Sequence, residues 1–480
     1  MVTIVVEKRS IVGENPMKQH ETEKFLRSWF VSSLCMEHYF QAGNVIRKIL
    51  LAVLLVSGLC CIRVSAAFVT WDGGAGTYDW FDKTNWSGDT AIPLSADEVR
   101  IYSGTASNNP VVISNTSVTA QADDLKIGAG AGNGGYLLVD SNVGISNGLW
   151  IATGGGTGRL DQYGGNLNLR NSGYLDGLYE MHGGCAEFST GGGSTYLRLG
   201  SAAGATGVFN QTGGAVTDGY AVLVGAISNG TGRYQLYGGT FYGDSFRVGN
   251  NGGMGTLVID TGLSGTPSAT NYSFNANFFR MGFSELNPDV TSVVEMKSGI
   301  FWVRSGGTFQ IGDTGNGSFL QTGGSVQLDN LTDLNIGADT GSGYYEISGT
   351  SYLYVGRSLL VGGGTATSAV FKVRGSEITN LQFGYQAGGT DVIVEANGTL
   401  AFEFDGGGIT PIDVKDDVLF KNGSKLSLKA SPLTTGGTYT VLSVSSAGKS
   451  ITDEGIAIIP TIYNKWHFQV TSNALKILYD

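Results

Sequence analysis

Basic side chains recur at one position of a short repeated phrase. In this phrase two apolar residues flank a middle residue and a glycine follows, as in Leu197-Arg198-Leu199-Gly200. If the apolar neighbours point inward, the middle residue points outward, because successive side chains of a strand alternate between its two faces. Stacked copies of the phrase would align a partly basic stripe on a protein of net charge -11, and its basic members are Lys126, Arg198, Arg247 and Arg280.

A stripe of this kind could bind anions. The planar guanidinium of arginine pairs with carboxylate or sulfate through two parallel hydrogen bonds, so one hypothesis is a track for acidic extracellular polysaccharide. Gln310, Asn335 and Gln382 would continue the stripe beyond its basic members. The plainer interpretation is a solvated strand face whose polar side chains discourage aggregation, and the residues favour this second one.

Three glutamines share another position in the repeat, two residues before a pair of glycines. Buried amides stacked in register could hydrogen-bond to one another from one repeat to the next. We therefore expect a structural amide ladder, with no ligand role, formed by Gln162, Gln211 and Gln321.

The residues that a carbohydrate-cleaving enzyme would need do not fall into columns. A glycosidase places two carboxylates across one sugar bond, but Asp218 and Asp244 sit at different offsets from the glycines that follow them. Beyond the leader the histidines are His182 and His467, far apart in the sequence. We therefore expect no catalytic residues and no enzyme, with a polysaccharide lyase or glycosidase as the alternative.

Cofactors and nucleic acid are not indicated either. The chain shows no Cys/His spacing for a metal ion and no tandem Gly-Gly-x-Gly-x-Asp calcium repeat. Cys185 is the one cysteine beyond the leader, so no disulfide is expected within the mature chain. The acidic balance is the opposite of that of a nucleic-acid-binding protein.

The repeat itself predicts the elements that position these side chains. The glycine-ended phrase returns at 197–200, 222–225 and 246–249, and a period in this range is typical of a solenoid. Two or three short strands closed by glycine corners make one coil, and coils are stable only when stacked. The sequence predicts an all-β, right-handed parallel β-helix of about 25 residues per coil over 121–389, with a capping segment at 67–120 and a β-rich C-terminal cap at 390–480.

The first 66 residues look like a leader. Residues 1–46 are polar and form either a true leader or a mis-assigned start, with Met36 as the other start. Residues 47–66 combine a basic pair, an apolar run and small residues at the end, which is the pattern of a secretory signal peptide. The apolar run is short for a membrane span, so we expect an exported protein that is not integral to the membrane after cleavage.

Two sets of motifs resemble a known group. The Trp71-Asp72-Gly73-Gly74 and Asn85-Trp86 pair before the repeats, together with the Gln-x-Gly-Gly phrases, is similar to the secreted, glycine-rich autotransporter and PEP-CTERM-associated repeat proteins. We recognise neither the outer-membrane barrel nor the sorting tail of that group. The resemblance implies bacterial-type export to the cell surface, the outer membrane or the medium, and a structural or adhesive role in an extracellular matrix. Polysaccharide or other surface proteins would be the partners.

Overall fold

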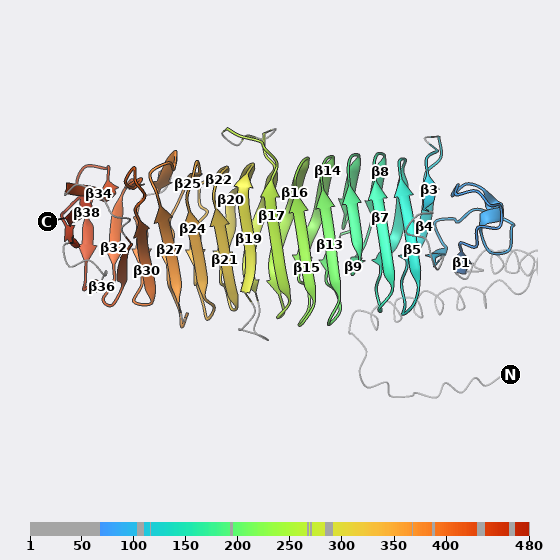
Figure 1. Ribbon diagram of the computed structural model, residues 1–480, viewed down its shortest axis with the longest axis horizontal. Helices are drawn as coiled ribbons and strands as arrows, with labels where there is room; N and C mark the ends of the chain where they lie inside the picture. The colour runs from blue at the N-terminus through green and yellow to red at the C-terminus, as the bar shows by residue number, and fades with distance from the viewer. Residues whose placement is uncertain are drawn as a thin grey trace, which may run out of the picture. The chain divides into compact units, whose positions relative to one another are not determined.

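The chain folds into a parallel β-solenoid of about 13 turns, each of roughly 26 residues, in agreement with the predicted fold class (Figure 1). The computed structural model describes residues 68–102, 110–115, 117–192, 195–265, 268, 271–283, 291–366, 368–385, 389–429, 437–459 and 466–479. The predicted leader and signal peptide lie outside these residues. The described part contains a single short helix and otherwise strands, turns and bends.

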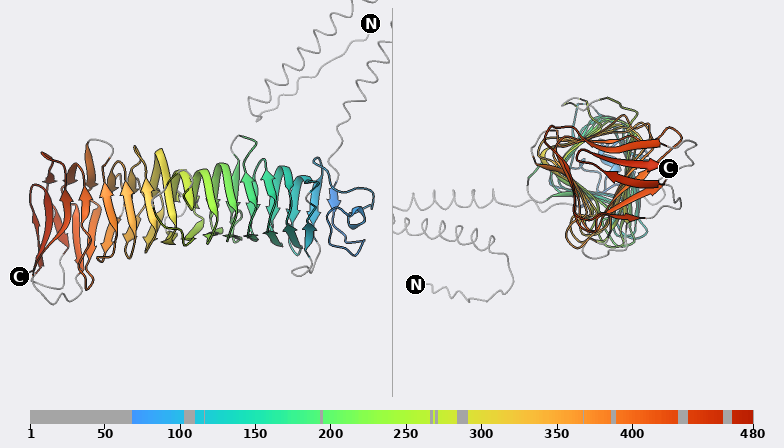
Figure 2. Two further views of the ribbon diagram at one scale, coloured as in Figure 1. Left: turned by 90° about the horizontal axis from the view of Figure 1, so that it is seen from above. Right: turned by 90° about the vertical axis from the view of Figure 1, so that its left-hand side faces the viewer.

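From β3 onward most coils contribute a strand to each of three faces, and seen end-on the coils superpose around one core (Figure 2). Face 1 is a fourteen-stranded parallel sheet. Its strands are β3 (Val111–Ile113), β5 (Gly134–Val139), β7 (Thr157–Gln162), β10 (Leu178–Met181), β13 (Thr206–Gln211), β15 (Thr231–Leu236), β17 (Met254–Asp260), β19 (Thr291–Ser298), β21 (Asn316–Gln321), β24 (Gly343–Ile347), β27 (Ala369–Arg374), β30 (Gly398–Glu403), β33 (Lys425–Lys429) and β36 (Ala457–Ile459).

Faces 2 and 3 form one bent sheet, because several strands run from face 2 into face 3. In β14, for example, the ladder shifts between Asp218 and Ala221, where the strand turns the corner. The strands that span both faces are β4 (Ala120–Ile127), β6 (Val143–Ile151), β14 (Ala215–Val224), β16 (Thr240–Asn250), β18 (Phe274–Phe283) and β20 (Ile300–Ile311).

The remaining strands belong to one of these two faces. Face 2 also holds β8 (Asn166–Leu169), β11 (Cys185–Phe188), β22 (Ser325–Leu328), β25 (Tyr352–Val355), β28 (Asn380–Phe383), β31 (Ile412–Val414) and β34 (Gly437–Val444). Face 3 also holds β1 (Phe68–Thr70), β2 (Glu98–Ile101), β9 (Gly173–Leu175), β12 (Tyr196–Leu199), β23 (Leu334–Ile336), β26 (Leu359–Val361), β29 (Thr390–Val394), β32 (Asp417–Phe420) and β35 (Ile451–Asp453).

The inward side chains stack in columns along the axis. Leu199, Val224 and Val248 pair in register and have no exposed surface, as the repeat predicted. Aromatic rings stack in the same way, with centroids 4.7 Å apart between Phe241 and Phe274 and 4.5 Å apart between Phe274 and Phe301. Burial of these columns supplies the main stabilisation, because an isolated coil could not remove its inner face from water.

The corner after face 3 explains the glycine of the repeated phrase. Gly225 has a φ of +71°, and a Cβ there would lie 2.5 Å from the backbone carbonyl of Met254 in the next coil. Both the left-handed backbone and the close approach of the next coil favour glycine. Ala152 occupies the equivalent corner with a φ of 58°, so the one alanine in the series adopts the glycine conformation.

The N-terminal end of the stack is covered by tryptophans around the 3₁₀ helix η1 (Lys83–Asn85). Trp80 and Trp86 are fully buried, with centroids 4.7 Å apart, and the Trp86 Nε1 donates a 2.7 Å hydrogen bond to the Trp80 carbonyl oxygen. Trp71 packs edge-on against Trp86. These rings shield the first coil from water and from pairing with another chain.

Parallel stacking continues beyond residue 389, where the sequence period fades. Face 1 extends to β36, and face 3 extends through β29 and β32 to β35. The corner glycine is replaced there by charged residues, and Lys421 Nζ lies 2.8 Å from Glu395 Oε1 of the previous coil. Among the named strands of the described residues, the antiparallel pairs are that of β37 (Trp466–Val470) with β38 (Ala474–Tyr479) and that of β38 with β34.

No helix of the described residues is long and apolar enough to cross a lipid bilayer.

Candidate functional site

The four basic residues of the predicted stripe occupy one outward column of face 3. In strand register, with one residue per coil, this column contains Lys126, Trp150, Tyr174, Arg198, Leu223, Arg247 and Arg280. Aromatic and apolar side chains therefore interrupt the basic ones. Gln310 and Asn335 continue this column, but Gln382 lies in β28 on face 2, so its expected place in the stripe was wrong. The apolar-x-apolar-Gly phrase that contains Gln382 ends face 2 of its coil, and Ile393 occupies the corresponding outward position on face 3.

In the N-terminal half of the column, neighbouring side chains contact one another. Lys126 Nζ lies 2.7 Å from Glu98 Oε1 and 5.4 Å from the centroid of the Trp150 ring. Trp150 stacks on Tyr174 at 5.7 Å with an 8° interplanar angle, and the Arg198 guanidinium lies 5.1 Å from the other ring of this pair, that of Tyr174. Glu98 offsets the charge of Lys126, and the cation–π contacts hold Arg198 against the aromatic rings without cancelling its charge. These side chains are therefore positioned by one another, and we interpret the segment as structural.

The ion pair at the start of this column is reflected in the pKa of its carboxyl group. Burial of Glu98 opposes ionisation, but hydrogen bonds from Lys126 and Arg100 outweigh it and lower the pKa of Glu98. Glu98 therefore stays charged and offsets part of the charge of the two cations that flank it.

Arg247 and Arg280 differ, because they lie on adjacent coils and share one aromatic ring. Their guanidinium carbons lie 5.0 and 5.5 Å from the centroid of the Phe283 ring. Within the described residues neither side chain is within ion-pair distance of a carboxylate, and both Nε atoms are buried without a hydrogen-bond partner. Two like charges one coil apart repel each other, so the pair is suited to an anion that would bridge them.

Asp313 does not form an ion pair with either arginine. Asp313 follows face 3 at the next corner and is 8% exposed. Burial raises the pKa of Asp313, and Arg280 and Arg247 only partly oppose that shift.

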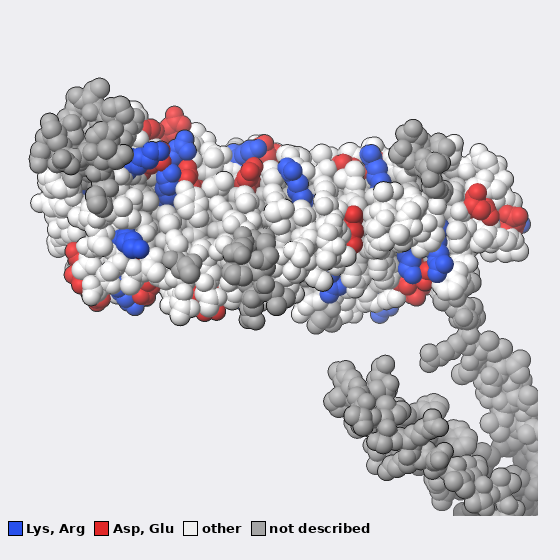
Figure 3. All heavy atoms as spheres, turned by 60° about the horizontal axis from the view of Figure 1, so that its bottom comes forward, with Lys and Arg blue, Asp and Glu red and all other residues white. Residues whose placement is uncertain are grey.

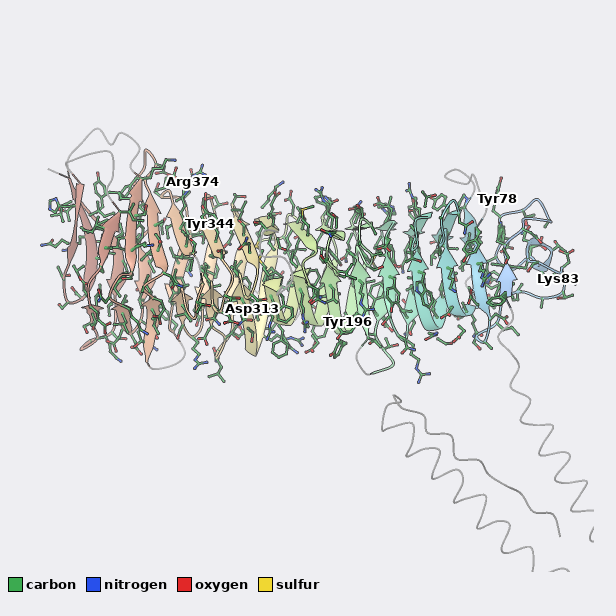
Figure 4. The ribbon with its side chains drawn as sticks, turned by 90° about the horizontal axis from the view of Figure 1, so that it is seen from below. Tyr78, Lys83, Tyr196, Asp313, Tyr344 and Arg374 are labelled. Carbon is green, nitrogen blue, oxygen red and sulfur yellow. The ribbon has the colours of Figure 1, made fainter. Side chains whose placement is uncertain are left out.

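A pocket of about 240 Å³ lies beside the two arginines. Its aromatic side is formed by Tyr220 and Phe278, and Phe278 is 37% exposed. Tyr196, labelled in Figure 4, packs edge-on against Tyr220 at 5.1 Å and extends the aromatic side by one coil. The lining is Tyr220, Ala221, Asp244, Ser245, Arg247, Phe278 and Arg280.

The acids near this pocket do not form a catalytic pair. Asp218 is in register with Gly243 and points into the core, where it is 4% exposed and accepts a 3.1 Å hydrogen bond from the Tyr220 backbone N–H. Asp244 is the next residue along and points outward, where it accepts a 2.7 Å hydrogen bond from Asn277. The two carboxyl groups therefore lie on opposite sides of the sheet.

The histidines lie away from these acids. His182 stacks on Tyr163 at 4.5 Å, and its Nδ1 lies 3.1 Å from the Thr212 hydroxyl. His467 is in β37 at the other end of the stack. Among the described residues no group of three or more His, Cys, Asp or Glu side chains is arranged to hold a metal ion.

The predicted amide ladder is wrong in its partners, although the three glutamines are fully buried at one register position of face 1. Met181 separates Gln162 from Gln211, and several coils separate Gln211 from Gln321. Each amide nitrogen instead donates to backbone carbonyls, as Gln211 Nε2 does to Gly214 O at 3.2 Å and to Thr240 O at 3.0 Å.

The partner that sequence reasoning missed is a tyrosine in the following coil. The hydroxyls of Tyr179, Tyr234 and Tyr345 donate to the Oε1 atoms of Gln162, Gln211 and Gln321. The sequence did contain a signal for this pairing. In each coil that follows a glutamine, a tyrosine stands two residues before the position that aligns with that glutamine. Complete burial raises the pKa of these phenols well above its ordinary value, so they remain donors.

Charged side chains are sparse over the view in Figure 3. On face 1 several of them pair with one another. Lys372 Nζ lies 3.2 Å from Glu346 and 2.6 Å from Glu403 in the coils on either side. Arg374, labelled in Figure 4 near Tyr344, lies 3.2 Å from the same Glu346. Face 1 therefore offers ion pairs already made, whereas the arginine pair of face 3 has none in the described residues.

The fold and the pocket thus define a parallel β-solenoid that carries on face 3, beside aromatic rings, an arginine pair without an ion-pair partner among the described residues. Comparisons of the chain with protein-family models, with curated proteins and with solved structures find no match.

Proposed function

We propose that this protein is a secreted or cell-surface, non-catalytic β-solenoid with a structural or adhesive role, and that it binds acidic extracellular polysaccharide at the Arg247–Arg280 pocket. The observation that carries the proposal is the adjacency of two guanidinium groups that lack a carboxylate partner among the described residues. A uronate carboxylate or a sulfate ester would supply the missing anion through paired hydrogen bonds.

The aromatic side of the pocket supports a sugar rather than a simple ion. Phe278 and Tyr220 offer apolar surface on which the C–H face of a sugar ring can pack, next to the charged group that the arginines hold. Arg247 and Arg280 lie on adjacent coils along the axis of the solenoid, so an extended polymer that lies along this axis can contact both.

The non-catalytic part of the proposal is supported by the placement of the acids. Asp218 faces the core and Asp244 faces solvent, so the pair does not span one sugar bond as a glycosidase requires. Incubation with pectin, alginate and sulfated glycans tests this part directly. If new reducing or unsaturated ends form with the wild-type protein and not with Asp244→Asn, the protein is an enzyme and this part of the proposal is wrong.

The binding test uses two double variants of equal charge change. Arg247→Ala with Arg280→Ala removes the pocket cations, and Arg233→Ala with Lys425→Ala removes two exposed cations from face 1. We expect the first to weaken binding to immobilised polyuronate or sulfated glycan at least tenfold and the second to change it less than twofold. Equal losses in both variants would mean that only net charge matters, and no loss in either would refute the site.

A further inference from the structure

Face 2 carries a second column whose chemistry differs from that of face 3. Over six consecutive coils the outward position alternates between an aromatic ring and an amide, in the order Tyr242, Asn275, Trp302, Gln327, Tyr354 and Gln382. Register alone fixes this order, since each residue is the paired neighbour of the one before it. The aromatic positions therefore recur every second coil.

The distance between successive aromatic rings of this column follows from the spacing of the coils. Neighbouring strands lie about 4.8 Å apart, so aromatic rings two coils apart are spaced by about 10 Å. This is close to the repeat of an extended β-1,4-linked glycan, in which alternate sugars turn over and the same face of the chain returns every second residue. Rings at this spacing would each contact one sugar face, and the amide between them could hydrogen-bond to the hydroxyls of the intervening sugar.

Tyr242 is 40% exposed, but Tyr272 interrupts the column after it, so the uninterrupted part begins at Trp302. Nearer the N-terminus, Tyr272 lies between Tyr242 and Trp302, with centroids 6.4 and 6.5 Å from theirs, and Asn275 is only 2% exposed. Trp302, Gln327, Tyr354 and Gln382 are all partly exposed. Tyr385 adds a ring 6.2 Å from Tyr354 and widens the platform at that coil.

Charged groups beside this column are already engaged. Arg304 donates to the Tyr242 hydroxyl and to the Gly243 carbonyl oxygen, and Asp329 accepts a 3.0 Å hydrogen bond from Gln327. Asp413 accepts from the Tyr385 hydroxyl. These contacts are hydrogen bonds to neutral groups, and among the described residues Arg304 has no ion pair and its Nε has no hydrogen-bond partner. The neutral rings and amides of the column itself are therefore what favour an uncharged polymer.

We infer that the Trp302–Gln382 segment of face 2 binds an uncharged, extended β-1,4-linked glucan chain, independently of the acidic glycan proposed for face 3. One molecule could then hold two chemically different polymers on two faces of one rod. Because the two surfaces share no residue, either can fail in experiment without the other.

The test is calorimetric titration of the full chain with cellohexaose, cellobiose and maltohexaose. We expect cellohexaose to bind at least tenfold more tightly than cellobiose, which can reach only one of the two rings spaced two coils apart. Maltohexaose, with α linkages that curve the chain, should bind at least tenfold more weakly than cellohexaose. Equal binding of the three sugars, or no binding of cellohexaose, would overturn the inference.

Variants locate the binding. Trp302→Ala and Tyr354→Ala should each weaken cellohexaose binding about tenfold, the loss of one stacking contact, whereas Trp150→Ala on face 3 should change it less than twofold. Circular dichroism of each variant confirms that the β-solenoid is retained, and the Tyr354 variant serves if the Trp302 variant does not fold. A loss shared by Trp150→Ala, or an unchanged affinity in both face 2 variants, would refute the site.

Discussion

The Tyr234 hydroxyl donates a 2.7 Å hydrogen bond to Oε1 of Gln211, two side chains from successive coils that are both completely buried. Replacing Gln211 with Leu would leave this hydroxyl without its acceptor and would remove one donor from the carbonyl oxygens of Gly214 and Thr240, although the Gly214 oxygen keeps its hydrogen bond from the Thr240 backbone N–H. We expect a loss of about 1–3 kcal/mol in the free energy of unfolding, measured by urea denaturation followed by circular dichroism.

Tyr234→Phe in the same background provides the check. Once the glutamine is gone, removal of the orphaned hydroxyl should recover part of the loss, because two apolar groups of the same shape need no partner. Gln235→Leu on the outer side of the same strand is the matched control and should cost less than about 0.5 kcal/mol. A double variant no better than Gln211→Leu would contradict the coupling.

Asp218 should make stability depend on pH. Burial raises the pKa of Asp218 to about 7, whereas the unfolded chain titrates near the ordinary value of about 3.9. Between these values the folded state holds a proton that the unfolded state has released, so stability is greatest at low pH and falls by up to about 1.4 kcal/mol per pH unit as pH rises to 7.

Urea titrations between pH 4.5 and 7.5 test this relation. Asp391 adds to the slope, because burial raises its pKa to about 7 as well. Asp218→Asn should therefore reduce the slope without abolishing it, and should stabilise the protein most above pH 7. A variant with the slope of the wild type would show that Asp218 is ionised in the folded protein.

The corner glycines should differ in their tolerance of alanine according to what lies beyond them. Gly225 and Gly306 both have φ above +70°, so each substitution incurs about 1–2 kcal/mol of left-handed backbone strain. Only at Gly225 would the new Cβ meet the backbone of the next coil, while nothing lies within 4 Å at Gly306. Thermal melts should therefore show a clearly larger loss for Gly225→Ala, and equal losses would count against the tight corner.

Arg198 should prove structural although it belongs to the predicted stripe. Its guanidinium lies 4.6 Å from the Tyr196 centroid and 5.1 Å from that of Tyr174. Arg198→Ala should lower stability by about 0.5–1 kcal/mol through lost cation–π contacts and leave affinity for acidic glycans within twofold. If it weakens binding as much as Arg280→Ala does, the whole column and not the pocket is the binding surface.

The fold was readable from the sequence wherever glycine closes the corners. Leu199, Val224 and Val248 stack inside as the phrase predicted, because alternation and a left-handed corner are both local properties of the chain. The stack beyond residue 389 was not readable, since Glu395 and Lys421 replace the corner glycines there and pair with each other. An ion pair between coils leaves no periodic residue type to detect.

The candidate site was predicted only in outline. Aligning the phrases placed Lys126, Arg198, Arg247 and Arg280 in one column, but the sequence could not show that Glu98 and Tyr174 occupy the first two of these. The face 2 column escaped notice because its aromatic residues recur every second coil, a period that comparison of single repeats does not reveal. Gln382 was assigned to the wrong face because the same apolar-x-apolar-Gly phrase can end either face 2 or face 3 of a coil.

The three glutamine–tyrosine pairs have a further effect on how the chain winds. Apolar coils of similar length are nearly interchangeable, so a nascent tube could close one turn out of place at little energetic loss. Such a slip would set a buried phenol or a buried amide against Met, Leu or Ile, and each misplaced group would forfeit its hydrogen bond in a medium without water. Gln162, Gln211 and Gln321 thus act as landmarks that make one winding of the chain lower in energy than its shifted alternatives.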